Sequence, residues 1–95
     1  MDLVSMQTAL AEFVVRRDWQ QFHTPKNLAM ALAGEAGELL ELFQWLTPEQ
    51  AAQIMHTPEQ AERVRHELAD VLSYLLRLAD VLEVDLAAAL GKRFS

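Results

Sequence analysis

The sequence contains no cysteine, and only three glycines and three prolines among its 95 residues. Without cysteine the chain has no disulfide framework, no zinc–thiolate site and no thiol nucleophile. No segment alternates with period two over a useful length, which disfavours a β-rich fold. Basic residues are also few, since eight Lys and Arg stand against fourteen Asp and Glu, for a formal net charge of −6. Sequence-independent binding to DNA or RNA needs a basic surface, so a nucleic-acid polymer is not expected as a partner.

Long apolar runs are missing as well, because no segment approaches the roughly 20 apolar residues that span a bilayer. The first six residues, Met1–Met6, lack the basic and apolar regions of a signal peptide. We therefore expect a cytoplasmic protein with no membrane partner. Hydrophobic residues nevertheless make up 52% of the chain. A single domain over residues 1–95 has little interior, so we expect part of this apolar surface to face another subunit.

Helical periodicity runs through most of the chain and predicts an all-α fold. The apolar positions predict helices at about 2–17, 25–46, 48–55, 58–82 and 86–93, with a loop at 18–24. Thr24-Pro25 fits an N-cap followed by proline, and Asp85 can cap the last helix. Thr-Pro-Glu-Gln occurs twice, at 47–50 and 57–60, each time with the spacing of a capping box. The predicted architecture is a bundle of four to five helices, completed by oligomerisation.

One carboxylate occupies a position where the 25–46 helix calls for an apolar residue. Glu35 falls inside an arc of leucines on the helical wheel, and Glu38 lies one step to the side. The leucines of this arc are Leu28, Leu32, Leu39 and Leu42. No basic residue stands three or four positions from either glutamate, so neither has a cationic partner on its own helix. Burying an unpaired carboxylate is costly, which indicates that something else compensates the charge.

Two further features support a site on this helix. Gly34 and Gly37 lie in its middle, where each costs about 1 kcal/mol relative to alanine. Close approach of another backbone or of a ligand would explain them. The 58–82 helix supplies a second acidic pair, Glu67 and Asp70. If the two long helices pack antiparallel, the pairs converge into an all-oxygen site that suits Mg²⁺, with Mn²⁺ as a substitute.

Two simpler interpretations stay open at this point. Most Glu-x-x-Glu pairs on helices are solvated surface, and Arg63 lies four residues before Glu67 and could form an ion pair with it. The chain could also be a non-enzymatic oligomerisation or interaction module. Such a module would show no dependence on a divalent metal, whereas the predicted site requires one.

The acidic pairs also form a recognisable signature. Glu35-Ala-Gly-Glu38 is followed 29 residues later by Glu67-Leu-Ala-Asp70. Further matching segments are RDWQQFH at 17–23, PKNL at 25–28, ELFQW at 41–45 and DVLSY at 70–74. Together they resemble the MazG-like nucleotide pyrophosphohydrolases, in particular the dCTP pyrophosphatase branch, over about residues 6–90.

The resemblance implies a subunit of the all-α NTP pyrophosphatase type. Its members hydrolyse a nucleoside triphosphate between the α- and β-phosphates, and the branch suggests dCTP or another deoxynucleotide and a house-cleaning role. It implies Mg²⁺ held by Glu35, Glu38, Glu67 and Asp70, and a homodimer or homotetramer with sites near subunit contacts. The residues that would line the nucleotide pocket are Trp19, Gln20, Gln21, Phe22, His23, Trp45 and Tyr74.

The mechanism and two departures from the family complete the prediction. We hypothesise that Glu38 is the catalytic base that deprotonates the attacking water. Relatives often carry a histidine where this chain has Leu10, so base preference can differ. Relatives also hold phosphates with a basic tail. In this chain only Lys92 and Arg93 could serve in that way, or else the role falls to Lys26 or to another subunit. The same fold without activity is a further alternative.

Overall fold

A computed structural model describes residues 2–94, so the two ends of the predicted domain, Met1 and Ser95, lie outside the described residues. The described chain is all-α, as predicted. Its helices are α1 (Leu3–Arg16), α2 (Pro25–Phe43), α3 (Pro48–Ala52), α4 (Pro58–Val81) and α5 (Leu86–Arg93), with 3₁₀ turns η1 (Gln20–Phe22) and η2 (Ile54–His56). Within residues 2–94, no helix has the length and hydropathy needed to span a membrane.

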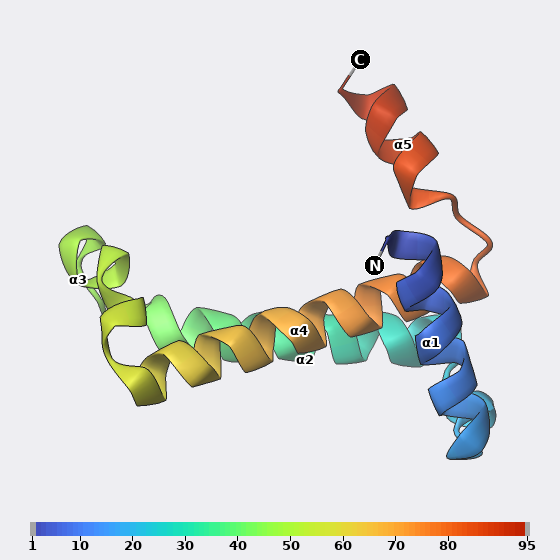
Figure 1. Cartoon of the computed structure of the whole chain (residues 1–95), viewed down its shortest axis with the longest axis horizontal. Helices are drawn as coiled ribbons and strands as arrows, with labels where there is room; N and C mark the ends of the chain where they lie inside the picture. The colour runs from blue at the N-terminus through green and yellow to red at the C-terminus, as the bar shows by residue number, and fades with distance from the viewer. Residues whose placement is uncertain (1, 95) are drawn as a thin grey trace.

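The two long helices, α2 and α4, form the centre of the molecule. They lie side by side and run in opposite directions (Figure 1). α1 packs against α4 where α2 begins and α4 ends, and there the Gln7 side chain donates a 3.3 Å hydrogen bond to the carbonyl of Leu76. α3 and η2 connect the two long helices at the opposite end, while α5 projects away from the pair (Figure 1). The antiparallel arrangement on which the predicted site depends is therefore present.

The core is thin. Leu28 and Leu76 are the largest side chains that are almost completely buried. Leu42, Ile54 and Val64 form a small cluster that joins α2, η2 and α4. Many other large apolar side chains remain exposed on all the longer helices. The single chain thus leaves much of its apolar surface uncovered.

The helix N-termini follow the predicted capping pattern with one exception. Thr24 and Asp85 accept hydrogen bonds from the first turns of α2 and α5. Thr47 and Gln50 form a complete capping box at the start of α3. Thr57 precedes α4 in the same tetrapeptide, but its side chain makes no capping hydrogen bond. The second predicted capping box is therefore wrong, and proline alone marks the start of α4.

Two predicted helix ends also differ. α2 ends at Phe43 rather than near residue 46, because Thr47 must be extended (φ −70°, ψ 162°) to cap α3 and the chain needs residues 44–46 to turn. The helix predicted at 48–55 is divided into α3 and η2, since Gln53 leaves the helical conformation (φ −102°, ψ 4°). This break lets Ile54 turn into the small cluster with α2 and α4.

The glycines of α2 are not explained by contacts within the chain. A Cβ atom added at Gly34 or Gly37 would meet no atom within 4 Å. The close approach expected from the sequence is therefore not made by any segment of residues 2–94. Both positions face open space, so each glycine is a cost of about 1 kcal/mol to the isolated helix.

Candidate functional site

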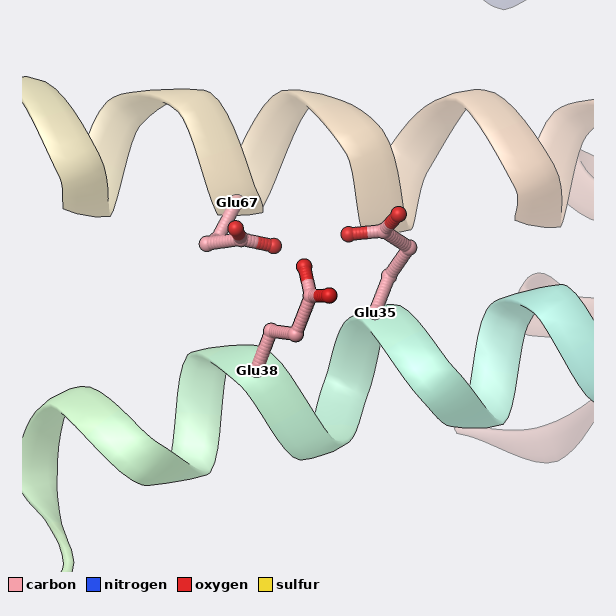
Figure 2. Close-up of side chains that lie close together, drawn as sticks. All are labelled: Glu35, Glu38 and Glu67. Carbon is pink, nitrogen blue, oxygen red and sulfur yellow. The ribbon is translucent and has the colours of Figure 1, made fainter.

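Three glutamates from the two long helices point toward one another (Figure 2). Glu35 and Glu38 are three residues apart, which places them on the same side of α2. Glu67 faces them from α4, and carboxylate oxygens of all three lie within 4.8 Å of one another. We call these residues the acidic cluster. The structure thus brings together three of the four acidic residues singled out by their spacing.

The acidic cluster contains buried oxygens that lack partners. The Oε2 atoms of Glu35 and Glu67 are both buried, and neither has a hydrogen-bond partner among residues 2–94. The alternative ion pair between Arg63 and Glu67 is not observed, because the ion pairs of the described chain join other residues. An uncompensated buried carboxylate is costly, so these two oxygens indicate a site for a positively charged ligand.

Crowding raises the pKa of Glu35 from its ordinary value of 4.5 to about 7. The largest cause is Glu67, whose carboxylate can accept a hydrogen bond from protonated Glu35, and desolvation comes next. The nearby Glu38 and the charge of Asp70 raise the pKa further. A divalent cation would reverse this effect by favouring the ionised form. A set of carboxylate oxygens without thiolate or imidazole matches the preferences of Mg²⁺ and Mn²⁺, so the residues fit such an ion.

The fourth acidic residue, Asp70, lies one turn after Glu67 on α4. It is not among the residues whose oxygens lie within 4.8 Å of one another. Its charge nevertheless contributes to the raised pKa of Glu35, and the residue also lines a neighbouring pocket. Asp70 therefore connects the acidic cluster to that pocket.

The pocket has a volume of about 170 Å³ and lies between α1, the segment that follows it, and α4. Of the residues predicted to bind substrate, Trp19, His23 and Tyr74 line it. The remaining walls are formed by Leu10, Phe13, Val14, Ser73 and Arg77. A largely apolar pocket with an indole, an imidazole and a phenol can hold a flat heteroaromatic ring beside the acidic cluster.

The end of α1 positions Trp19. Asp18 adopts a left-handed conformation (φ 56°), and the N–H groups of Asp18 and Trp19 donate to carbonyls in the last turn of α1. This is a Schellman motif, which reverses the chain direction. The Trp19 ring then meets Phe13 edge-on, with centroids 5.6 Å apart. The Arg17 guanidinium lies 4.9 Å from the Phe13 ring centroid and 5.9 Å from that of Trp19, so this wall of the pocket is held by several contacts.

Arg77 belongs to the pocket but was not among the predicted site residues. Its Nε donates to Nδ1 of His23 at 3.3 Å, and its Nη1 donates to Oδ2 of Asp80 at 3.0 Å. Burial and, secondarily, the charge of Arg77 lower the pKa of His23. The helical period offered a signal for this residue, because Arg77 follows Asp70 by seven positions and so lies on the same face of α4.

The model of the MazG-like family matches residues 31–94, a segment that contains the acidic cluster and Asp70. The chain belongs to the MazG-like family. The dCTP pyrophosphatase 1 of Homo sapiens is 49% identical to this MazG-like chain over 79 residues, which is 83% of the chain and 46% of the human protein. That of Bos taurus is 48% identical over 79 residues, which is 83% of the chain and 47% of the bovine protein.

The MazG-like chain spans about half the length of these curated relatives. Among solved structures, it is similar to a pyrophosphatase from Archaeoglobus fulgidus, with a TM-score of 0.83 and 39% sequence identity. That similarity covers 90% of this chain and 79% of the archaeal chain. The α-helical arrangement described above is therefore shared with a pyrophosphatase of known structure.

Some predicted substrate residues lie away from the pocket in this MazG-like chain. Residues 20–22 form η1, are exposed and do not line the pocket. Trp45 follows the C-terminal end of α2 and is 86% exposed, whereas Trp19 precedes the N-terminal end. The 19 residues of α2 correspond to about 28 Å of helix rise, so the two tryptophans stand at opposite ends of the molecule.

The basic residues predicted to bind phosphate are also dispersed. Lys26 is exposed in the first turn of α2. Lys92 and Arg93 are exposed in the last turn of α5, which projects away from the α2–α4 pair (Figure 1). The structure of the single chain does not bring Lys92 or Arg93 to the acidic cluster.

Proposed function

We propose that this MazG-like protein is a metal-dependent pyrophosphohydrolase that cleaves a nucleoside triphosphate into the monophosphate and pyrophosphate. The observation that carries the proposal is the pair of buried, unpaired oxygens on Glu35 and Glu67 within a cluster of carboxylates. The dCTP pyrophosphatase relatives support the substrate class, and dCTP or another deoxynucleotide is the proposed preference. Such an enzyme would clear unwanted nucleotides from the cytoplasmic pool.

In this proposal Glu35, Glu67 and Asp70 would hold Mg²⁺, for which Mn²⁺ can substitute, and Glu38 stays available as a base. A divalent cation held there would supply the positive charge that neutralises the phosphates, so that a chain of net charge −6 could accept an anionic substrate. Glu38 is the more exposed member of the acidic cluster, so a water can reach it. We assign it the role of general base, which accepts the proton of the attacking water.

The proposed nucleotide lies along α4. Asp70 and Tyr74 both line the pocket from this helix, and Asp70 is the point where the pocket meets the acidic cluster. With the phosphates at the acidic cluster, the base extends toward Trp19 and His23. The edge-on Phe13 contact and the Schellman turn hold the Trp19 indole, so it can stack on the base without first becoming ordered.

The reaction is tested with a panel of dNTPs and NTPs at fixed Mg²⁺, scored separately for pyrophosphate and orthophosphate. We expect pyrophosphate release, the fastest turnover for dCTP or another deoxynucleotide, and loss of activity in EDTA that Mg²⁺ or Mn²⁺ restores. Release of orthophosphate alone would show that the bond between the β- and γ-phosphates is cleaved instead. No release from any nucleotide, together with no Mg²⁺ binding, would favour the non-enzymatic interaction module.

The role of Glu38 is tested with Glu38→Gln, which keeps the size of the side chain and removes its basicity. We expect kcat to fall about 100-fold or more, the usual contribution of a general base, while calorimetry still detects Mg²⁺. Glu41→Gln is the matched control, because Glu41 is an exposed glutamate of α2 outside the acidic cluster. Near-normal turnover of Glu38→Gln with intact metal binding would remove Glu38 from this role.

We also propose that the protein is a homodimer or a dimer of dimers. Its accessible surface of 7140 Å² exceeds the roughly 5,500 Å² expected of a compact 10.8 kDa monomer by about 1,600 Å². Its radius of gyration of 15.5 Å likewise exceeds the roughly 12 Å of a compact chain of this length. Two copies that each cover this excess would bury about 3,200 Å², which is in the range of obligate dimers.

The surface that a second copy would cover includes an apolar groove between α1 and α4. Its volume is about 410 Å³, and Leu10, Phe13, Leu72 and Leu76 are among its walls. Leu68 and Leu75 continue this exposed apolar surface along α4. Sedimentation equilibrium should therefore give at least twice the chain mass, and Leu72→Asp should lower it. A monodisperse monomer at all concentrations would contradict the assembly.

A further inference from the structure

Arg77 is held from two sides at the edge of the pocket. Its Nε donates to Nδ1 of His23, which comes from the segment between α1 and α2. Its Nη1 forms an ion pair with Asp80, one turn later on α4, at 3.0 Å. The side chain is only 11% exposed, so the guanidinium has little freedom to leave these partners. This arrangement fixes the position of the imidazole relative to α4.

The same contact determines where His23 carries its proton. A guanidinium stays protonated in proteins and can only donate hydrogen bonds, so Nδ1 of His23 must accept with a free lone pair. In a neutral imidazole the proton then resides on Nε2, since the bond made by one ring nitrogen selects the tautomer of the other. Burial and the charge of Arg77 lower the pKa of His23, which further disfavours the doubly protonated ring.

We propose that Arg77 is a positioning residue for base selection, which keeps His23 neutral with Nε2–H as a fixed donor toward the nucleotide base. This inference rests on the proposed function. A fixed donor favours a base with an acceptor at that point, such as N3 of cytosine. Thymine carries N3–H at the equivalent position, so two donors would face each other and this base is disfavoured.

The location of Arg77 separates this role from the chemistry of the phosphates. It follows Glu67 by ten residues on α4, or about 15 Å of helix rise. It therefore stands well beyond Asp70, at the end of the pocket away from the acidic cluster. The Ser73 hydroxyl, which also lines the pocket, donates to the carbonyl of Ala69 and is therefore already engaged. We expect Arg77 to influence KM and base preference, with little effect on kcat for dCTP.

The first test measures the tautomer of His23 by long-range ¹H–¹⁵N NMR of the full chain without nucleotide. The His23→Gln variant assigns the His23 signals among those of the three histidines. We expect an unprotonated Nδ1 and a protonated Nε2 in the wild type. In Arg77→Met we expect a mixture of tautomers, and in Arg77→Lys, which keeps a cationic donor, a return toward the Nε2–H form. A wild-type ring with its proton on Nδ1 would overturn the proposal.

The second test compares kcat and KM for dCTP and dTTP. We expect Arg77→Met to lower the ratio of kcat/KM for dCTP to that for dTTP about tenfold, because a free imidazole can accept from thymine as readily as it donates to cytosine. Arg65→Met is the matched control. Arg65 lies on the same helix, is 64% exposed and pairs only with Glu62 among the described residues, so the ratio should stay constant.

Two results distinguish this proposal from a phosphate-binding role of Arg77 and from a failure of the proposed function. If Arg77→Met weakens the binding of dCTP, dTTP and inorganic tripolyphosphate by the same factor, then Arg77 binds phosphate and the assignment to base selection is overturned. If the wild type hydrolyses no nucleotide, the proposed function fails, while titration of the NMR sample with dCMP and dTMP still reports on base selection. Equal affinity of the wild type for dCMP and dTMP in that titration would overturn the inference itself.

Discussion

Replacing Glu35 by glutamine should stabilise the metal-free protein and remove most of its response to Mg²⁺. Oxygens of the acidic cluster lie within 4.8 Å of one another. Two unit charges at that distance repel by about 3.5 kcal/mol at an effective dielectric constant of about 20, and by about 0.9 kcal/mol in water. At pH 8, where Glu35 is largely ionised, Glu35→Gln removes this repulsion. We expect a gain of about 1–3 kcal/mol in the free energy of unfolding in EDTA.

The assay is thermal or urea unfolding at one fixed protein concentration, in EDTA and in saturating Mg²⁺. For a chain of this size 1 kcal/mol shifts Tm by about 4–8 °C, so the effect in EDTA is easily measured. Mg²⁺ at about 100 times Kd should stabilise the wild type by about 2.7 kcal/mol, and the variant by much less. Metal therefore reduces or reverses the advantage of the variant.

Glu41→Gln provides the control for this experiment, since it makes the same chemical change on the same helix outside the acidic cluster. It should leave both unfolding curves near those of the wild type. The reasoning is refuted if Glu35→Gln is less stable than the wild type in EDTA, or if both proteins gain equally from Mg²⁺. Either result would mean that the carboxylates neither repel one another nor share a cation.

Three further predictions follow from the structure. Because the pKa of Glu35 is raised to about 7, the folded metal-free protein binds more protons than the unfolded chain between about pH 4.5 and 7, so its stability should fall as pH rises through this window. Mg²⁺ affinity measured by calorimetry should increase from pH 6 to pH 8, because the ionised carboxylate binds the cation. Flat profiles in both measurements would contradict this. Gly34→Ala should raise the free energy of unfolding, measured with urea, by about 1 kcal/mol, since a Cβ there meets no atom within 4 Å. A loss of stability would instead be evidence of a contact from another subunit. Thr47→Ala should cost about 1 kcal/mol by removing the capping box, whereas Thr57→Ala, in the same tetrapeptide, should cost only a few tenths; equal losses would disprove the assigned difference in capping.

Much of the local structure was predictable because it depends on neighbours in the sequence. Helical periodicity located every long helix, and the side chains of Thr24, Thr47 and Asp85 cap helices as expected. One error in the helix ends is local, because α2 stops at Phe43 so that the chain can turn and Thr47 can cap α3. The other occurred where distant residues decide the outcome, because the segment after α3 breaks at Gln53 and Ile54 packs with Leu42 and Val64 across the hairpin.

The sequence by itself determined the all-α class and the anomalous position of Glu35, since an acid inside an apolar stripe with no cation within one turn is visible from spacing alone. Only the tertiary structure decided that the carboxylate of Glu67 lies beside that of Glu35, and that Arg63 does not form an ion pair with Glu67. It also decided that the side chain of Arg77 reaches His23. These outcomes depend on how two antiparallel helices are placed along and around each other. Local sequence does not encode that placement, because it is set by packing between residues that are far apart in the chain.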